Sequence, residues 1–186
     1  MDHEPTSTRK AVLRRGIVEV LRGVPTPLPD VASQVALWLR GHPEIRRITL
    51  FFPLSGEPDL MRLVAWFPER TWCFPRVIDA HALAFHPVLD PDKELQPSAF
   101  GIREPREGAV GIPIREIDAF ICPGLAFDRS GGRLGRGCGY YDRMLAGARE
   151  DAVRIGASFA CQIVDSTHSE SHDVRMDVVI CESGII

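Results

Sequence analysis

The segment from Asp128 to Asp142 concentrates glycines and arginines in one loop, with the sequence DRSGGRLGRGCGYYD. Glycines allow the backbone to approach a polyphosphate and to adopt positive φ, and the N–H groups at the start of a helix attract anions. Arginines add charge-assisted hydrogen bonds to phosphate oxygens. The segment has neither a Walker A pattern nor the spacing of a dinucleotide fingerprint. Taken alone it predicts a phosphate-binding loop, with a flexible solvated turn as the alternative.

Two basic residues near the amino end have the spacing of one helical face. Lys10 and Arg14 are four positions apart, so a helix would present both side chains on the same side. They could converge on phosphates, or they could form an ordinary solvated basic surface.

The run from Phe52 to Glu57 passes from apolar to acidic within one turn. A flat heterocycle needs apolar contacts such as Phe52, and a carboxylate such as Glu57 can accept hydrogen bonds from ring N–H groups. A surface loop with a buried Phe is the alternative.

Two aspartates are candidate ligands of Mg²⁺, Asp142 at the end of the glycine loop and Asp177 further along. Asp142 could equally be a helix cap. His168 and His172 lie four apart, but no third nitrogen or sulfur ligand has a suitable spacing, so we discount zinc. The sequence has no GxSxG elbow and no recognised Cys-His arrangement, so covalent catalysis is unsupported.

Helical and β-rich patterns alternate along the chain. An amphipathic helix is expected from Thr6 to the proline-rich stretch 25–29, and a second helix between Asp30 and Gly41. Their apolar surface is predicted to comprise Leu13, Ile17, Val20, Leu21, Val31, Val35, Leu37 and Trp38. Further helical patterns occupy residues 59–69 and 141–149, and strands are predicted at 47–52, 71–77, 119–122, 154–159 and 178–181.

This alternation predicts an α/β fold, a single-domain three-layer sandwich that is Rossmann-like, with a largely parallel sheet and helices on both faces. Residues 79–114 are predicted to form hairpins and loops. Ligands of such sheets lie beyond the carboxyl ends of the strands, so the loops after Phe52, Pro75 and Cys122 are where we expect the site.

The composition is that of an ordinary globular protein, with 186 residues, 45% hydrophobic and 25% charged, and a net charge of -3. We expect one domain spanning residues 1–186, and no nucleic acid partner, because such proteins are usually more basic. Five cysteines without a CxxC pair favour a reducing compartment, and no apolar stretch is long enough for a signal or a membrane anchor. These features predict a cytoplasmic protein with no membrane partner, and we expect a monomer.

Several motifs together resemble the 5-formyltetrahydrofolate cyclo-ligase family, also called methenyltetrahydrofolate synthetases. Residues 135–143, GRGCGYYDR, resemble its nucleotide-binding signature. Other matching pieces, in family order, are KAVLR at 10–14, Glu57, FGIREP at 100–105, PGLAFD at 123–128, Gln162, His172-Asp173 and Asp177. Two positions depart from the pattern: Cys138 replaces a common Lys or Gly, and His168 replaces a common Pro.

The resemblance implies an ATP- and Mg²⁺-dependent ligase that converts 5-formyltetrahydrofolate to 5,10-methenyltetrahydrofolate and releases ADP and phosphate. It implies that the formyl oxygen attacks the γ-phosphate and that N10 then closes the ring, without a protein nucleophile.

The resemblance also assigns roles to residues. It implies ATP contacts from Lys10, Arg14, Arg133, Leu134, Gly135, Arg136, Gly137, Cys138, Gly139, Tyr140 and Tyr141. It implies folate contacts from Phe52, Glu57, Arg136, Gly137, Gly139 and Tyr140. Catalytic roles fall to Arg133, Arg136 and Tyr140, and Mg²⁺ ligation to Asp142 and Asp177.

Two other functions stay open at this point. The chain could be a non-catalytic module on the same scaffold that binds nucleotide or RNA phosphate, as the change at Cys138 would allow. It could also be an ATP-using enzyme that acts on another pterin or on a formylated amine.

Overall fold

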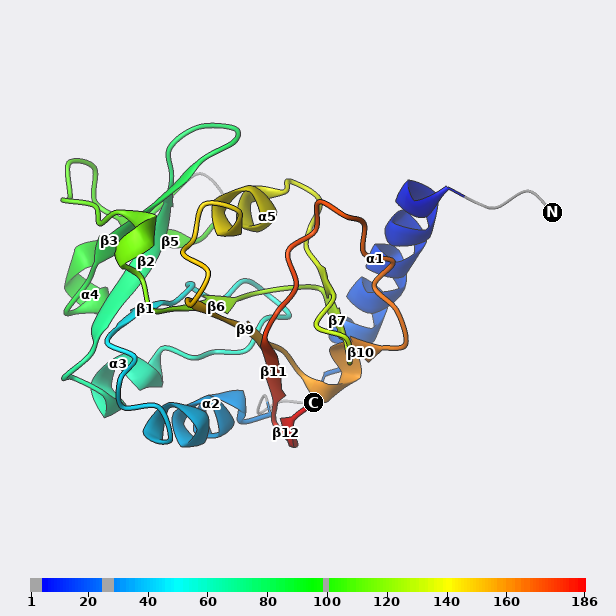
Figure 1. Cartoon of the computed structure of the whole chain (residues 1–186), viewed down its shortest axis with the longest axis horizontal. Coiled ribbons are helices and arrows are strands. Elements are labelled where there is room, and N and C mark those ends of the chain that lie inside the picture. Colours follow the sequence, from blue (N-terminus) through cyan, green and yellow to red (C-terminus); the bar gives the residue numbers. More distant parts are fainter. Residues whose placement is uncertain (1–4, 25–28, 99–100) are drawn as a thin grey trace.

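Seven strands form the central sheet of the protein, in the order β12-β11-β9-β6-β1-β2-β3 (Figure 1). The structure is a computed structural model that describes residues 5–24, 29–98 and 101–186. The sheet strands are β1 (Arg47–Thr49), β2 (Thr71–Val77), β3 (Leu83–Pro87), β6 (Ala119–Cys122), β9 (Val153–Ala157), β11 (Val178–Cys181) and β12 (Gly184–Ile185). The five inner strands are parallel, whereas the edge strands β3 and β12 pair antiparallel.

Side chains of the inner strands alternate between two apolar layers. In β6 all four residues are buried; Ala119 and Ile121 pack in one core cluster and Phe120 and Cys122 in another. Strands buried on both faces have apolar side chains throughout. Helices α2 (Val31–Arg40) and α3 (Arg62–Trp66) cover the first face, and α5 (Tyr140–Leu145) covers the second (Figure 1).

A second, three-stranded sheet lies beside the first, with the strand order β10-β7-β8. Its strands are β7 (Ala126–Asp128), β8 (Arg133–Leu134) and β10 (Ile163–Val164), and helix α1 (Thr6–Arg22) packs against it. Figure 1 shows α1 along β7 and β10 at one side of the molecule. The small sheet therefore holds the first part of the glycine loop, up to Leu134, next to α1.

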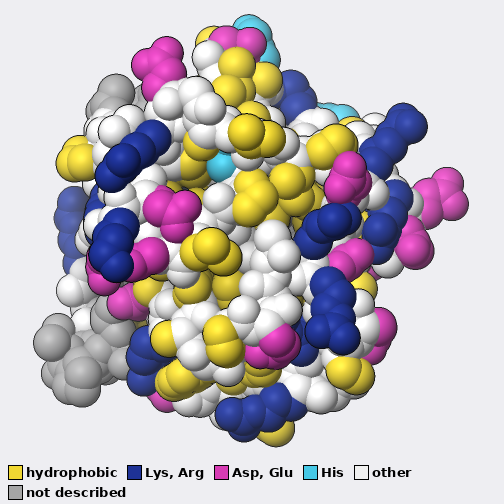
Figure 2. Space-filling view, turned by 90° about the vertical axis from the view of Figure 1, so that its left-hand side faces the viewer, with side chains coloured by type: hydrophobic (Ala, Val, Ile, Leu, Met, Phe, Trp, Pro, Cys, Tyr) yellow, Lys and Arg dark blue, Asp and Glu magenta, His cyan; other side chains and the backbone are white. Residues whose placement is uncertain are grey.

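A short hairpin joins the other side of the main sheet. It comprises α4 (Pro91–Glu94), β4 (Leu95–Pro97) and β5 (Arg103–Pro105), and β5 lies against β2. Single 3-10 turns occupy Ile114–Glu116 and Ala160–Gln162. On the face that carries this hairpin, side chains of both charges are interspersed with hydrophobic ones (Figure 2).

The predicted mixed α/β fold with a large, mostly parallel sheet is confirmed. All five predicted strands and the first two helices exist, whereas the patterns at 59–69 and 141–149 form helices only at Arg62–Trp66 and Tyr140–Leu145. Asp30 caps α2 by accepting a hydrogen bond from Ser33 N at 3.1 Å. The proline-rich stretch at 25–28 and Phe100 of the FGIREP segment lie outside the described residues.

Two residues predicted on apolar faces are solvent-exposed. Leu37 is 63% exposed because it lies two positions from both Val35 and Leu39, on the opposite side of α2. Val20 is 47% exposed because α1 buries only a narrow stripe against the small sheet.

In the described ranges, no helix combines the length and the apolar character needed to cross a bilayer.

Candidate active site

A cavity of about 770 Å³ opens at the carboxyl ends of β1, β2 and β6. The parallel strands run in the order β2-β1-β6-β9-β11, so the direction of the chain across the sheet reverses between β1 and β6. Loops that leave in opposite directions at such a reversal leave a crevice between them. The loops after Phe52, Pro75 and Cys122, predicted from the sequence, all contribute to its wall.

Most residues predicted to bind a ligand line this cavity. They are Lys10, Arg14, Phe52, Glu57, Arg133, Leu134, Gly135, Arg136, Gly137, Cys138, Gly139, Tyr140, Tyr141 and Asp142. Segments from residue 10 to residue 142 thus converge on one space.

Helix α1 supplies two cations to the cavity. Lys10 is 8% exposed, and its Nζ donates to Asp173 Oδ2 at 2.5 Å and to Glu170 Oε2 at 2.9 Å. Burial favours a lower pKa for Lys10, but hydrogen bonds to the two carboxylates outweigh it, so its pKa is raised. One turn later, Arg14 Nε donates to the carbonyl oxygen of Gly135 at 2.9 Å, which ties α1 to the glycine loop.

Asp128 organises the start of the glycine loop. Its Oδ1 accepts hydrogen bonds from Ser130 N, Ser130 Oγ and Gly132 N, and its Oδ2 accepts from Thr167 N and Oγ1. Burial opposes ionisation of Asp128, but these bonds outweigh it and hold its pKa well below its usual range. A Cβ on Gly132 would collide with the Asp128 carboxylate and the Thr167 hydroxyl. The loop is therefore a tightly built turn rather than a flexible one.

The second half of the loop depends on glycine at two positions. Gly137 has φ of 108° and Gly139, directly before α5, has φ of 67°, a region that other residues rarely adopt. Cys138 lies exposed between them, and its carbonyl oxygen accepts a hydrogen bond from Arg143 Nη2 at 2.8 Å. Tyr140 donates its hydroxyl to the carbonyl oxygen of Asp79 at 3.1 Å, so the loop after β2 holds this ring in place.

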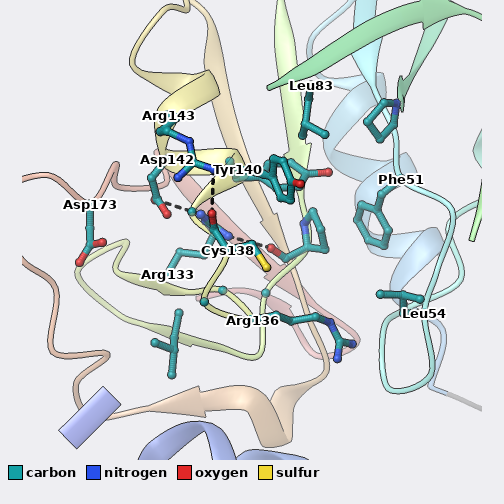
Figure 3. Close-up of a pocket in the computed structure, with 18 of the residues that line it drawn as sticks. Phe51, Leu54, Leu83, Arg133, Arg136, Cys138, Tyr140, Asp142, Arg143 and Asp173 are labelled. Carbon is teal, nitrogen blue, oxygen red and sulfur yellow. Dashed lines mark hydrogen bonds and ion pairs between the residues drawn. The ribbon is translucent and has the colours of Figure 1, made fainter. Parts of the chain in front are cut away.

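Arg133 and Asp142 form an ion pair in the cavity, at what we call its charged end (Figure 3). Arg133 Nη2 donates to Asp142 Oδ1 at 2.9 Å and Nη1 donates to the Pro123 carbonyl oxygen at 3.2 Å. The guanidinium also lies over the Tyr141 ring, 5.4 Å from its centroid. Since Arg133 is only 6% exposed, it fixes the position of Asp142 as well as supplying charge.

Glu57 connects this end to the apolar end. It is 6% exposed; its Oε1 accepts from Nε and Nη2 of Arg136, and its Oε2 accepts from Leu54 N at 3.0 Å. Figure 3 shows Asp142 and Asp173 on one side of the cavity and Phe51, Leu54 and Leu83 on the other. The space thus has one charged end and one apolar end.

Asp177 is the predicted site residue that the cavity lining does not include. It immediately precedes β11, and its Oδ2 accepts a hydrogen bond from Arg154 N at 2.7 Å at the start of β9. That is the amino edge of the sheet, opposite to the edge that carries the cavity. The structure therefore does not bring Asp177 to Asp142, and the predicted pairing of these two carboxylates is corrected.

Sequence reasoning assigned no role to several other lining residues. These include Phe51, Leu54, Leu83, Ile102, Arg103, Glu104, Arg143, Glu170 and Asp173. The His-Asp motif is a sequence signal for Asp173, and the FGIREP motif at 100–105 is one for the β4–β5 hairpin, but neither motif places its residues in the cavity. His168, which replaces a common Pro, has φ of 56°, which proline cannot adopt, so this loop differs locally from a proline-containing one.

Comparison with known proteins gives a consistent result. A sequence model of the 5-formyltetrahydrofolate cyclo-ligase family matches residues 7–182. The 5-formyltetrahydrofolate cyclo-ligase of Haemophilus influenzae is 31% identical over 155 residues, which cover 80% of this chain and 82% of that protein. The corresponding protein of Mycolicibacterium smegmatis is 30% identical over 186 residues, covering 95% and 96%.

Solved structures extend the similarity to three dimensions. The 5,10-methenyltetrahydrofolate synthetase of Aquifex aeolicus, solved by NMR, superposes with a TM-score of 0.81 at 28% identity and covers 95% of this chain and 91% of that chain. The synthetase of Mycoplasma pneumoniae has a TM-score of 0.74 at 23% identity and supports the fold alone. With a match over nearly its whole length, the chain belongs to the 5-formyltetrahydrofolate cyclo-ligase family.

Proposed function

We propose that this chain catalyses the ATP-dependent conversion of 5-formyltetrahydrofolate to 5,10-methenyltetrahydrofolate, with release of ADP and phosphate. The observation that carries the proposal is the cavity with two unlike ends, at which the predicted ATP residues and the predicted folate residues meet. A reaction that joins a phosphate donor to a flat, reduced pterin requires both kinds of surface in one space.

The charged end suits the triphosphate of ATP. Lys10, Arg14, Arg133 and Arg136 supply positive charge, and the turn from Gly135 to Gly139 exposes backbone to the cavity. We assign charge neutralisation during phosphoryl transfer to Arg133 and Arg136. Tyr140 would position the ligands at the edge of the cavity. No protein nucleophile is needed, because the formyl oxygen attacks the γ-phosphorus and ADP leaves, after which N10 attacks the formyl carbon and loses its proton to solvent, and phosphate leaves.

The carboxylates of the charged end fit Mg²⁺, which prefers hard oxygen ligands. Asp142 and Asp173 both line this end, and one oxygen of each is already oriented by a cation, Arg133 or Lys10. Ligand atoms of Glu170, His172 and Asp173 lie within 4.8 Å of one another. We therefore propose Asp142 and Asp173 as the Mg²⁺ ligands in place of Asp177. When bound, the ion would neutralise charge on the phosphates.

We further propose that residues 1–186 form one domain with a Rossmann-like sheet, and that the protein works as a monomer in the cytoplasm. The strand order β2-β1-β6-β9-β11 supports the first point. The five cysteines, none of which forms a disulfide, agree with a reducing compartment.

The competing function is a non-catalytic module that binds nucleotide or RNA phosphate. The mixed charges in Figure 2 and the net charge of -3 give it little support. The apolar end of the cavity, with Glu57 at its border, has no use in such a module.

The test is direct. Purified protein is incubated with 5-formyltetrahydrofolate and Mg-ATP, and the near-ultraviolet absorbance of the methenyl product is followed, with ADP measured in parallel. We expect product and ADP in equal amounts. ATP binding without product at high enzyme concentration would instead support the non-catalytic module.

A further inference from the structure

Glu104 is the feature of the cavity that the proposed function leaves unexplained. It lies on β5, its side chain contributes to the cavity wall, and it is 6% exposed. Most of the residue is therefore shielded from bulk water.

Little in the protein compensates for this burial. Within the described residues, the only hydrogen bond to the Glu104 carboxylate comes from Val77 N to Oε1 at 3.4 Å, while Oε2 accepts none. No cation among the same residues forms an ion pair with it. A carboxylate that lacks a cation and a strong donor keeps acceptor capacity for a ligand.

The other carboxylates of the cavity differ in this respect. Glu57 pairs with Arg136, Asp142 pairs with Arg133, and Asp173 and Glu170 pair with Lys10. Both oxygens of Glu57 are already engaged, by Arg136 and by Leu54 N. Glu104 is therefore the carboxylate with the most acceptor capacity left for a ligand.

The surroundings of Glu104 define that ligand. Val77, Leu83 and Ile102 give this end of the cavity apolar walls, and the Arg103 guanidinium lies 5.7 Å from the centroid of the Phe52 ring. A flat heterocycle fits such walls when its polar edge meets an acceptor. The reduced pteridine of folate presents two parallel donors on one edge, the 2-amino group and N3–H, which match the two oxygens of a carboxylate.

We infer that Glu104 sets the orientation of the pteridine by accepting hydrogen bonds from this aminopyrimidine edge, and that it is a specificity-determining residue. The identity of the ligand rests on the proposed function. The geometry of Glu104 does not depend on turnover, so binding can test it separately.

The first test is Glu104→Gln. The amide oxygen can still accept from Val77 N, but the amide nitrogen is a donor and would face the donors of the ligand. We expect the Kd for 5-formyltetrahydrofolate, measured by calorimetry without ATP, to rise about 10- to 100-fold, while the Kd for Mg-ATP is unchanged. Glu107→Gln, at an exposed position two residues beyond β5, is the matched control and should bind both ligands normally.

The second test removes the ligand's donor. An analogue of 5-formyltetrahydrofolate with a methyl group in place of the 2-amino group should bind wild type about tenfold more weakly, but bind Glu104→Gln within about twofold of the parent ligand. If Glu104 only holds the hairpin against β2, Glu104→Gln weakens the binding of both ligands equally. The ratio of the Kd of the analogue to the Kd of the parent ligand then stays at its wild-type value, which overturns the inference. An unchanged Kd for Glu104→Gln overturns it too.

Failure of the proposed function and failure of the inference about Glu104 would give different experimental results. If wild type binds 5-formyltetrahydrofolate but does not convert it with Mg-ATP, the proposed function fails and the ratio test still decides the role of Glu104. If wild type does not bind the ligand at all, both fail. Should Glu104→Gln not fold, Glu104→Asp, which retracts the charge by one methylene, should lower the same ratio.

Discussion

Arg136 and Glu57 form an ion pair across the cavity, with Nε and Nη2 of the arginine 3.2 and 3.1 Å from the same carboxylate oxygen. The glutamate side chain is 7% exposed and the arginine side chain 43% exposed. The pair joins the loop after β1 to the glycine loop, so one electrostatic unit spans the proposed folate and phosphate halves. A substitution of either residue should therefore change kcat/KM for both ATP and 5-formyltetrahydrofolate.

Arg136→Ala tests this coupling. Removing the cation leaves Glu57 buried and unpaired, so we expect kcat/KM to fall about 100-fold or more for both ATP and 5-formyltetrahydrofolate. The free energy of unfolding should fall by about 1–3 kcal/mol. Steady-state kinetics and thermal unfolding measure the two effects. Arg129→Ala, exposed in the same loop, is the control, and equal activity of the two variants would refute the coupling.

Metal dependence distinguishes three aspartates. Asp142→Asn and Asp173→Asn should each require a higher Mg²⁺ concentration for half-maximal turnover, because each loses a charged oxygen ligand. Asp177→Asn should keep the wild-type Mg²⁺ dependence and lose less than about 1 kcal/mol of stability, through its bond to Arg154 N. Chelation by EDTA should abolish turnover, and added Mg²⁺ should restore it. A Mg²⁺ dependence altered by Asp177→Asn alone would contradict this assignment and favour Asp177 as a ligand, as the sequence predicts.

Asp128 should make stability depend on acid pH. Its pKa is lowered in the folded protein, so its contribution is complete above the ordinary value of about 3.9 and is lost as pH falls toward the folded value. We expect Asp128→Asn to lower the free energy of unfolding by about 2–4 kcal/mol at pH 7, and by less at pH 3. Guanidinium denaturation at both pH values measures the difference, with the exposed Asp165→Asn as control. A gap that does not narrow in acid would contradict this account.

Cys138 should be the thiol whose modification inactivates the enzyme. Burial raises the pKa of Cys73 and of Cys122 to about 12, and burial also raises the pKa of Cys161, so these thiols react slowly near pH 7.5. Iodoacetamide should label Cys138 first, as peptide mass spectrometry would show, and turnover should fall in step with that label. Mg-ATP should protect, and Cys138→Ser should stay active after treatment. Loss of activity in that variant at the wild-type rate would point to another residue.

The sequence predicts the main sheet well because its inner strands are short apolar runs bounded by turn residues. It predicts hairpins within residues 79–114, as found for β4 and β5, but not their bounds, and it does not predict β7, β8 and β10, because strands of two or three residues are too short to show a period. The site follows the same division. Residues inside the glycine loop are contiguous, so their proximity follows from the sequence itself.

The carboxylates illustrate what local patterns leave out. Asp173 and Asp177 lie four positions apart, yet one lines the cavity and the other meets Arg154 at the opposite edge of the sheet. The difference depends on where β11 begins, at Val178, which the spacing of the two aspartates does not reveal. Glu104 belongs to the FGIREP motif, but its place in the cavity depends on the packing of a hairpin against β2, a long-range contact that the motif does not reveal.

The bond from Lys10 to Asp173 joins residues 163 positions apart. On the ribosome, Lys10 emerges long before Asp173 is synthesised. The buried ammonium of Lys10 therefore has no counter-charge until nearly the whole chain has been made. Nascent chains should therefore be unable to retain nucleotide until the last segment is released. The active site is therefore completed late in synthesis, and premature termination after β9 would yield a chain with five of the seven main-sheet strands and no competent phosphate site.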